Sequence, residues 1–440
     1  MNFLKNLGMF IVTVLALGVW VMMPWQGVAA IAVLLAVWMF VFRSGAQTRS
    51  VAAVGISTLS QRMGSSAVIV VGIAGVVGVL VALLAMAEGY GETLRNSGST
   101  DTAIVMRGAS ANEVSSSLSR EDIVQIQQAP GVARNAKGEP ILSAETVVAA
   151  NLPVKGSKTG DEGSAQVRGV SDAAFDVRPN VKIIEGRKFQ PGLRELVIGK
   201  GAVRQFEGLK VGATLKLGNQ PWTIVGIFAS NDAMESELWG DGNAVNDVYR
   251  PNAGGSRNTA TVKLESPGAF KAFSDALEAN PQLKVKASTT LDFFAKQSEQ
   301  MTKILRIIGI VVGSIMAVGA VFGALNTMFA AVATRAREIA TLRAIGFRGL
   351  PVVVAVMLET MLLALIGGAV GGLIAWAIFN GVEASTMAAG SVGKLSFSLR
   401  VSGQLLWEGI KWALAIGFIG GLFPAVRAAS LPVTTALREL

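Results

Sequence analysis

Long apolar runs separate the polar segments of this chain, and their lengths are the first guide to its fold. Six runs reach about 20 residues, the length that an α-helix needs to cross a bilayer. They occupy residues 3–23, 26–42, 67–87, 304–332, 352–379 and 405–423. The first two are separated only by a turn at Pro24 and Trp25, so they predict a hairpin. A cleaved signal peptide is the alternative for the first run, but that run exceeds a usual signal core and a second run follows at once. We expect it to be retained.

Lys and Arg residues around these runs predict the orientation of the chain. If the six runs alternate in direction, a set of basic side chains falls on one side of the membrane, where only Glu338 and Glu439 oppose them. This set is Lys5, Arg43, Arg49, Arg62, Arg335, Arg337, Arg343, Arg348, Arg427 and Arg438. Short cytoplasmic loops are rich in basic residues. We therefore predict an inner-membrane protein with both termini in the cytoplasm and residues 88–303 in the periplasm.

The segment 88–303 carries the signals of a separate α+β domain. Ser119 and Asp122 have the spacing of a capping box that opens a short helix before Pro130. The predicted strands are 195–199, 212–218 and 222–228, the further predicted helices are 267–279 and 291–303, and the predicted loops are 156–163 and 240–255. The helix predicted at 291–303 continues without a breaker into the fourth apolar run.

These features predict a membrane protein of six transmembrane α-helices, with a large α+β periplasmic domain inserted between the third and fourth helices. The predicted divisions are a hairpin at 1–43, a cytoplasmic linker at 44–66, the third helix at 67–87, the periplasmic domain at 88–303, the fourth helix at 304–332, a cytoplasmic segment at 333–351, the fifth and sixth helices with a short periplasmic loop at 352–423, and a cytoplasmic tail at 424–440.

The cytoplasmic segment between the fourth and fifth runs combines charge with an apolar face. A membrane anchor needs positive charge only, whereas Ile339, Leu342 and Ile345 also recur at helical spacing. An apolar face outside the bilayer fits either a protein groove or the headgroup plane, and we favour the groove of a partner protein. The predicted docking residues are Arg335, Arg337, Glu338, Ile339, Leu342, Arg343 and Gly346.

Polar and small residues inside the runs are further candidates. A charge at the centre of a membrane helix costs about 2.5–3.5 kcal/mol, so Glu359 is expected to face protein or water. We favour a role in packing the docking segment over a substrate or proton site. Glycine pairs four residues apart predict close helix packing, either within one subunit or between two copies. They are Gly309 and Gly313, Gly319 and Gly323, Gly367 and Gly371, Gly368 and Gly372, and Gly417 and Gly421.

The composition argues against several classes of function. The chain has no Cys and no His, so Ser-His-Asp and Cys-His catalysis and the usual zinc sites are excluded. Of the 39 basic and 30 acidic residues, 25 of each lie in 88–303. The net charge of +9 therefore reflects membrane topology rather than a nucleic-acid surface. A phosphate-binding loop of the Gly-x4-Gly-Lys-Ser/Thr type is absent from the sequence. We expect no catalytic, cofactor or metal site in this chain.

Several stretches resemble the MacB-type permeases, also called type VII ABC exporters. The segment 333–375 has their order of elements: an Arg/Glu pair, a Leu-Arg-Ala run that ends in glycine, a Glu in the next span and a double-glycine patch. The run from Phe423 is similar to the Pro-Ala-x-Arg-Ala-Ala ending of their last span. The third apolar run, which ends at 87–89, resembles their first membrane helix. Their periplasmic region is similar to the segments 119–132, 185–189, 195–199, 211–212 and 222–228.

The resemblance covers residues 54–440 and implies a permease subunit with no fused ATPase domain. It implies that a separate cytoplasmic ABC ATPase binds ATP and Mg, presses on residues 335–346 and thereby moves the periplasmic domain, a process called mechanotransmission. It also implies a second permease copy, identical or paralogous, membrane lipid, and a periplasmic adaptor with an outer-membrane duct for export of a drug, peptide or amphiphile. The N-terminal hairpin is additional to the family's four spans.

Two alternatives remain at the level of sequence. The first is a lipoprotein-releasing permease of the LolC/LolE kind, which has the same fold. An FtsX-like regulator of cell-wall hydrolases fits less well, because that family usually has a smaller outer domain. From a different class, the chain fits a membrane-anchored receptor or scaffold without an ATPase, in which the basic docking segment has no partner.

Overall fold

The structure is a computed structural model, and it describes residues 19–20, 23–59, 63–157, 160–387 and 392–430. Its chain forms two compact units. The helical unit comprises Met1–Ala85, Leu305–Asn380 and Arg400–Leu440, and the sheet unit comprises Met86–Ile304 and Gly381–Leu399. The chain therefore passes between the two units at four places, rather than at the two expected for a simple insertion.

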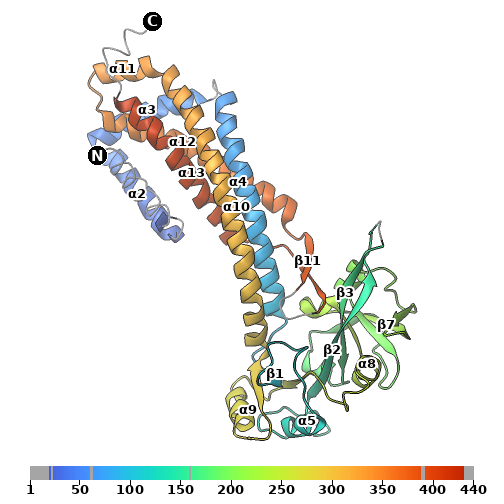
Figure 1. The fold of residues 1–440 in the computed structure, drawn as a ribbon. Coiled ribbons are helices and arrows are strands. Elements are labelled where there is room, and N and C mark those ends of the chain that lie inside the picture. Colours follow the sequence, from blue (N-terminus) through green and yellow to red (C-terminus); the bar gives the residue numbers. More distant parts are fainter. Residues whose placement is uncertain (1–18, 21–22, 60–62, 158–159, 388–391, 431–440) are drawn as a thin grey trace, which may run out of the picture. The chain divides into compact units, whose positions relative to one another are not determined.

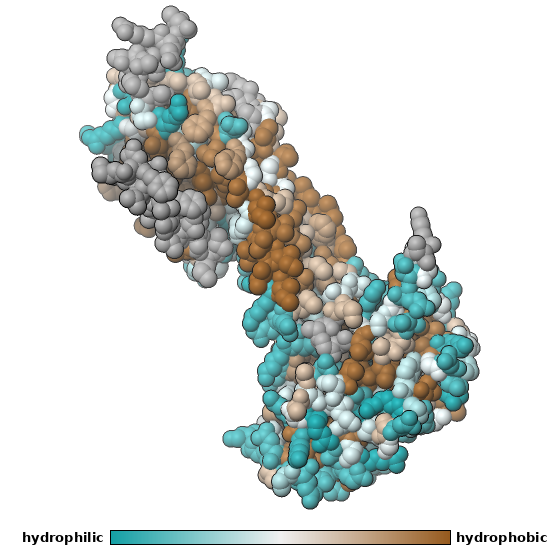
Figure 2. All heavy atoms as spheres, viewed as in Figure 1, coloured by the Kyte–Doolittle hydropathy of each residue, from teal (hydrophilic) through white to brown (hydrophobic). Residues whose placement is uncertain are grey.

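Four long helices form the bundle of the helical unit (Figure 1). They are α4 (Met63–Asn96), α10 (Thr290–Thr334), α12 (Gly349–Phe379) and α13 (Gly403–Ser430). Each is long and apolar enough to cross a membrane. Figure 2 shows hydrophobic residues gathered over these helices. They correspond to the third to sixth predicted runs, and α10 is a single helix of 45 residues, which includes the predicted continuation from 291–303 into the fourth run.

The N-terminal part differs from the simple hairpin that the sequence predicts. Helix α2 (Trp25–Val41) covers the second run, and it is followed by α3 (Arg43–Ser57), which bends away by 101°. Among the described residues, a fifth crossing arises only if this bent pair counts as one span. Most of the first run lies outside the described residues. The predicted linker at 44–66 is largely the helix α3.

Glycines let the bundle helices approach one another closely. A Cβ added at Gly371 would lie 2.4 Å from the carbonyl oxygen of Ala74 on α4, and one at Gly417 would lie 2.4 Å from Cβ of Ala364 on α12. The predicted pairs Gly309/Gly313, Gly367/Gly371, Gly368/Gly372 and Gly417/Gly421 all face helices of the same chain. By contrast, a Cβ at Gly319 or Gly323 would meet no atom of the described residues within 4 Å. Four of the five pairs thus have packing partners within one subunit.

The sheet unit is built on ten strands in the order β10-β1-β9-β2-β3-β8-β5-β7-β4, with β6 paired to β7. Its strands are β1 (Thr102–Arg107), β2 (Leu142–Pro153), β3 (Glu162–Val170), β4 (Lys182–Gly186), β5 (Glu195–Gly199), β6 (Thr214–Leu217), β7 (Gln220–Ala229), β8 (Glu237–Asp241), β9 (Thr259–Lys263) and β10 (Val285–Thr289). Its short helices are α5 (Arg120–Gln127), α6 (Ala174–Val177), α7 (Lys200–Gln205), the 3₁₀ helix η2 (Ala233–Ser236), α8 (Gly242–Tyr249) and α9 (Ala269–Glu278).

Strand β2 joins two halves of this sheet. Residues 142–145 pair with β9, and residues 146–153 pair with β3. One apolar core lies under β1, β9 and β10 and includes Ile126 of α5 and Phe273 of α9. The other lies under β5, β7 and β8 and includes Val245 of α8. The long strand therefore links two separately packed cores.

Local sequence signals in the sheet unit predict several elements correctly. Ser119 and Asp122 form both bonds of the capping box at the start of α5. The strands predicted at 195–199 and 222–228 are β5 and part of β7. The predicted loop at 240–255 is wrong, because α8 occupies Gly242–Tyr249. Ala244 and Val245 anchor this helix in the apolar core, which outweighs the low helix propensity of its glycine.

The segment between α12 and α13 is also more ordered than the short loop that the sequence predicts. It forms the hairpin of β11 (Glu383–Met387) and β12 (Lys394–Ser398), which packs on the sheet unit. The backbone N–H of Ser396 donates to Oγ of Ser236 at 2.8 Å. Phe397 is buried and meets Tyr90 edge-on, with ring centroids 5.6 Å apart. The hairpin is therefore an integral part of the sheet unit.

Candidate functional sites

The predicted docking segment is a short helix with tight ends. Helix α11 (Ala336–Ala344) follows α10 after the single residue Arg335. At its other end Gly346 has φ +104, a conformation that favours glycine, and the N–H of Phe347 donates to the carbonyl oxygen of Leu342 at 3.1 Å. This segment is therefore an ordered connection between two apolar helices.

Arg335 ties α11 to α12. Its guanidinium donates to Glu359 at 3.1 Å and to Glu338 at 3.2 Å. Glu359 is buried, with only 4% of its surface exposed. A carboxylate in an apolar helix needs such a partner, because an unpaired charge is costly there. Glu359 thus lies in an ion pair with Arg335, the residue that joins α10 to α11, and its role in packing the docking segment stays a prediction.

Helix α3 lies against the same ion pair. Its buried face consists of Gly45, Thr48, Val51, Ala52 and Gly55. A Cβ added at Gly55 would lie 2.9 Å from Oε2 of Glu359 and 3.3 Å from Nη1 of Arg335. A larger residue would therefore displace the pair. Sequence reasoning treated this region as a linker, although small residues three and four positions apart are the pattern that would have revealed a packed helix.

The two faces of α11 are not arranged as the sequence suggests. Ile339 is 5% exposed and belongs to the core of the bundle, and Leu342 packs beside Val51 and Ala355. The apolar face that we predicted for a partner is thus covered by the chain itself. Ile345, in contrast, is 69% exposed. The outward surface, here called the coupling surface, consists of Arg337, Glu338, Thr341, Ile345, Gly346 and Arg348, while Arg343 is half-buried.

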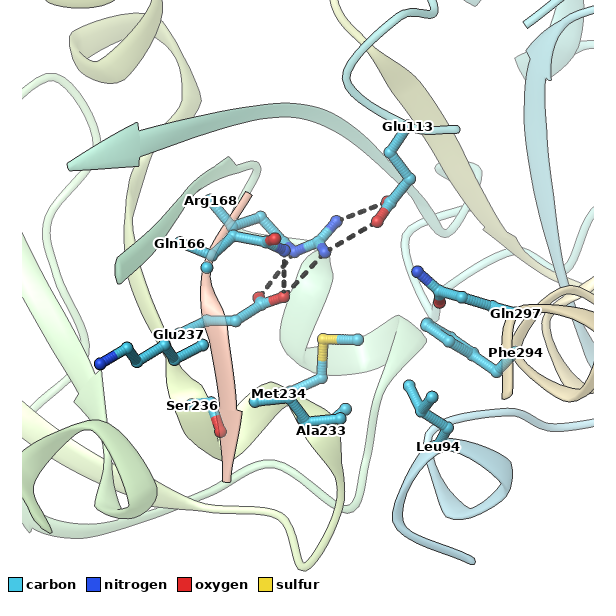
Figure 3. Close-up of a pocket in the computed structure, with 13 residues that line it drawn as sticks. Leu94, Glu113, Gln166, Arg168, Ala233, Met234, Ser236, Glu237, Phe294 and Gln297 are labelled. Atoms are coloured by element: carbon cyan, nitrogen blue, oxygen red, sulfur yellow. Dashed lines mark hydrogen bonds and ion pairs between the residues drawn. The ribbon is translucent and has the colours of Figure 1, made fainter. Parts of the chain in front are cut away.

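A second candidate site is a buried cluster of charged side chains in the sheet unit (Figure 3). Arg168 on β3 lies in ion pairs with Glu113, Glu145 and Glu237 at 2.7–2.8 Å. Its side chain is 1% exposed. Arg178 pairs with Glu145 at 2.6 Å from the other side. We call these five residues the Arg168 network.

The Arg168 network joins the two halves of the sheet. Glu145 lies on β2 where it pairs with β9, whereas Glu237 begins β8 in the other half. Figure 3 shows a pocket beside Arg168, Glu113 and Glu237 that Met234 and Phe294 also line. Its volume is about 30 Å³, far below the roughly 300 Å³ of a drug-sized ligand site. The network is therefore a structural tie rather than a ligand pocket.

Burial and pairing act in opposite directions on these groups. Burial alone would raise the pKa of Glu145, but the charges of Arg178 and Arg168 outweigh it and hold the pKa below its usual value. Burial likewise opposes the charge of Arg168, but the neighbouring carboxylates raise its pKa well above the usual value. Nearby Asp232 has no cation of this kind, and burial raises its pKa to about 6 despite hydrogen bonds from Ser230 and Asn180.

No group of three or more His, Cys, Asp or Glu side chains suited to a metal ion occurs among the residues that the structure describes.

Two family profiles match this architecture. Residues 66–280 match the MacB-like periplasmic core domain, and residues 310–433 match the FtsX-like permease C-terminal region. The chain belongs to the MacB-type ABC permease family. With four apolar helices and this core domain, it is a multi-pass membrane protein that resembles MacB and FtsX-like permeases.

Relatives of known sequence support this assignment. The macrolide export ATP-binding/permease protein MacB of Acinetobacter baylyi is 27% identical over 336 residues, which cover 68% of this chain and 47% of that protein. The uncharacterized ABC transporter permease YknZ of Bacillus subtilis is 24% identical over 312 residues, 67% of this chain and 75% of YknZ. The chain thus spans about half the length of that MacB protein and three quarters of YknZ.

Among solved structures, the periplasmic region of MacB from Actinobacillus actinomycetemcomitans is similar with a TM-score of 0.34 and 16% identity, covering 47% of this chain and 97% of that one. The extracellular domain of YknZ from Gram-positive bacteria gives a TM-score of 0.33 and 17% identity, covering 43% and 100%.

Proposed function

We propose that this chain is a permease subunit whose motion is driven by a separate cytoplasmic ABC ATPase. The chain itself is non-catalytic, and ATP and Mg are bound by that partner. The termini and α11 lie in the cytoplasm and the sheet unit in the periplasm. The basic residues near α3, α11 and the end of α13 support this orientation.

The observation that carries the proposal is the coupling surface. Helix α11 is fixed to the bundle in two ways: Ile339 is buried in the core of the bundle, and Arg335 forms an ion pair with Glu359 of α12. A push on its exposed face is therefore passed to α12 and α10 rather than absorbed by a loose loop. The same segment exposes Ile345, an apolar residue, and the basic residues Arg337 and Arg348, which suits an ATPase groove with acidic edges.

Mechanotransmission would then use three routes out of the membrane. Two are the helices α4 and α10, each of which runs unbroken from the helical unit into the sheet unit. The third is the β11–β12 hairpin, which connects α12 and α13 to the sheet unit. Several connections constrain the periplasmic body more tightly than one, so tilting of the bundle would move it as a unit.

We propose a drug, peptide or amphiphile as the exported substrate, with a second permease copy, and with an adaptor and an outer-membrane duct as further partners. Gly319 and Gly323 are available for the second copy, since a Cβ added at either would meet no described atom within 4 Å. Lipoprotein release remains the alternative within the family.

The first experiment is purification of the tagged full chain from its host's membranes in mild detergent, with identification of co-purifying proteins. An ATPase with a Walker motif is expected. An adaptor alongside it would support export, and bound lipoproteins would support release. If crosslinking also yields no ATPase, the chain is a receptor or scaffold instead.

A pair of variants locates the contact. Ile345→Glu places a charge on the coupling surface and should reduce ATPase recovery strongly. Ile184→Glu is the matched control, because Ile184 is also exposed (55%) but lies on β4 of the sheet unit. Equal ATPase recovery with both variants would show that the coupling surface is not the docking site.

A further inference from the structure

An apolar cavity of about 1240 Å³ lies between α2 and the bundle. Val28, Ala29 and Ala32 of α2 line one side, and Leu84 of α4 and Ile310 of α10 line the other. This volume exceeds the roughly 300–1,000 Å³ that encloses a drug-sized ligand. Because these helices belong to the membrane-spanning unit, hydrocarbon rather than water is the natural filling of such a space.

The position of α2 beside this cavity is fixed by hydrogen bonds around Lys411. The indole N–H of Trp20 donates to the carbonyl oxygen of Lys411 at 3.1 Å. The ammonium of Lys411 in turn lies 3.5 Å from the carbonyl oxygen of Met23, at the turn before α2. Lys411 is 7% exposed although it lies on an apolar helix. These two hydrogen bonds join the residues just before α2 to α13, beside the cavity.

The lining of the cavity also includes charged and aromatic side chains. Arg306 on α10 and Glu408 and Lys411 on α13 line it, together with Trp25, Trp407 and Trp412. The chain leaves the sheet unit twice, after Ile304 and after Leu399. Arg306 follows the first of these points, and α13 begins at Gly403, shortly after the second. These side chains therefore mark the end of the membrane region, where Trp residues usually gather. The described charged side chains of the lining carry two positive charges and one negative charge.

We propose that this cavity binds one acidic phospholipid of the surrounding membrane. The acyl chains occupy the apolar wall, and the headgroup phosphate lies against Arg306, with Lys411 adding positive charge. An arginine guanidinium matches phosphate oxygens in both charge and geometry. The N-terminal segment, which is additional to the family's four spans, thereby gains a role: it holds a lipid against α10. This proposal is independent of the ATPase, since it concerns only the helical unit and its bilayer.

The test compares lipids with the same acyl chains but different headgroups. The full chain in detergent is incubated with phosphatidylglycerol or phosphatidylcholine, and native mass spectrometry measures the fraction with one bound lipid. Both lipids carry a phosphate, but the choline cation of phosphatidylcholine is repelled by Arg306 and Lys411. Phosphatidylglycerol should therefore bind about tenfold more tightly. Arg306→Gln should bring the two affinities close together.

Two further variants separate headgroup from cavity. Lys303→Gln is the matched control, because Lys303 lies one turn earlier on α10 and pairs with Glu299 at 2.6 Å outside the cavity lining. It should keep the wild-type preference. Ala29→Phe fills the cavity and should reduce binding of both lipids.

Three results would overturn the proposal. The first is equal binding of the two lipids to the wild-type chain, and the second is an unchanged preference in Arg306→Gln. The third is extraction of a non-phospholipid amphiphile as the resident ligand of the purified chain, which would indicate a substrate site. If Ala29→Phe does not fold, the first two measurements still decide.

Discussion

Replacing Arg168 by Met is the sharpest perturbation of the sheet unit. Met has a similar length but no charge, so Glu113, Glu145 and Glu237 lose the guanidinium that all three share. Only Glu145 keeps a cation, because Arg178 remains beside it. The variant therefore leaves Glu113 and Glu237 buried without a cation at the junction of the two cores, although Glu237 keeps hydrogen bonds from Gln166 and Trp239.

The size of the effect follows from burial. Removing one partner of a buried ion pair typically costs about 3–5 kcal/mol, because the other charge stays buried and uncompensated. For a domain of this size, each kcal/mol lowers the melting temperature by about 2–4 °C. Arg168→Met should therefore lower the melting temperature of the sheet unit by roughly 6–20 °C at neutral pH.

Lowering the pH should restore part of the stability that Arg168→Met loses at neutral pH. In the wild type, the pKa of Glu145 in the folded state is below its usual 4.5, so its pairing stabilises the fold above that pH and is lost as the pH falls through the folded pKa. In Arg168→Met, buried carboxylates without their cation take up protons more readily when folded than when unfolded. The stability difference between the two proteins should therefore be largest near pH 7–8 and shrink toward pH 5.

The assay measures thermal unfolding of the full chain in detergent at several pH values, with tryptophan fluorescence as the signal. Arg187→Met is the matched control: Arg187 also pairs with a glutamate, Glu195 at 2.5 Å, but its side chain is half exposed. It should change the melting temperature much less. The reasoning would be refuted if the melting temperature of Arg168→Met lay within about 2 °C of the wild type, a shift worth only about 1 kcal/mol. A difference that stays constant across pH would refute it as well.

Three other measurements test separate parts of the structure. Asp232→Asn should flatten the pH dependence of stability. In the wild type, the folded-state pKa of Asp232 is about 6 and exceeds the usual 3.8, so stability rises as the pH falls from 7 toward 4. An unchanged pH dependence in the variant would contradict this. Gly371→Val should destabilise the bundle by about 1–3 kcal/mol or more, since a Cβ at Gly371 would meet the backbone of α4. Gly75→Val, where an added Cβ would meet no described atom within 4 Å, should have little effect, and equal melting temperatures would disprove the packing argument. Phe397→Ala should cost about 3–5 kcal/mol and increase protease cleavage of the β11–β12 hairpin, and an uncleaved hairpin would show that Phe397 does not anchor it.

Much of the helical unit could be predicted from the sequence. A helix that faces lipid must be apolar over its whole length, so α4, α10, α12 and α13 stand out as continuous runs whatever they pack against. The capping box at Ser119 and Asp122 is equally visible, because both of its hydrogen bonds join residues three apart.

The candidate coupling site could be located from the sequence but not oriented. The spacing of Ile339 and Leu342 shows that one face of α11 is covered, yet nothing in that spacing says by what. The structure covers this face with the chain's own bundle, partly through α3, and leaves Ile345 outside. Orientation depends on packing between segments that are distant in sequence, which periodicity does not encode.

The sequence by itself therefore determined the membrane-spanning helices, the separate soluble body and the family, because lipid solvation and local capping act on neighbouring residues. Only the tertiary structure decided that Arg168 gathers three glutamates, which lie 55, 23 and 69 positions away along the chain. It also decided that the segment between α12 and α13 is a packed hairpin and that α3 lies on the Arg335–Glu359 pair. These arrangements follow from strand pairing and close packing, which bring together side chains that no local pattern connects.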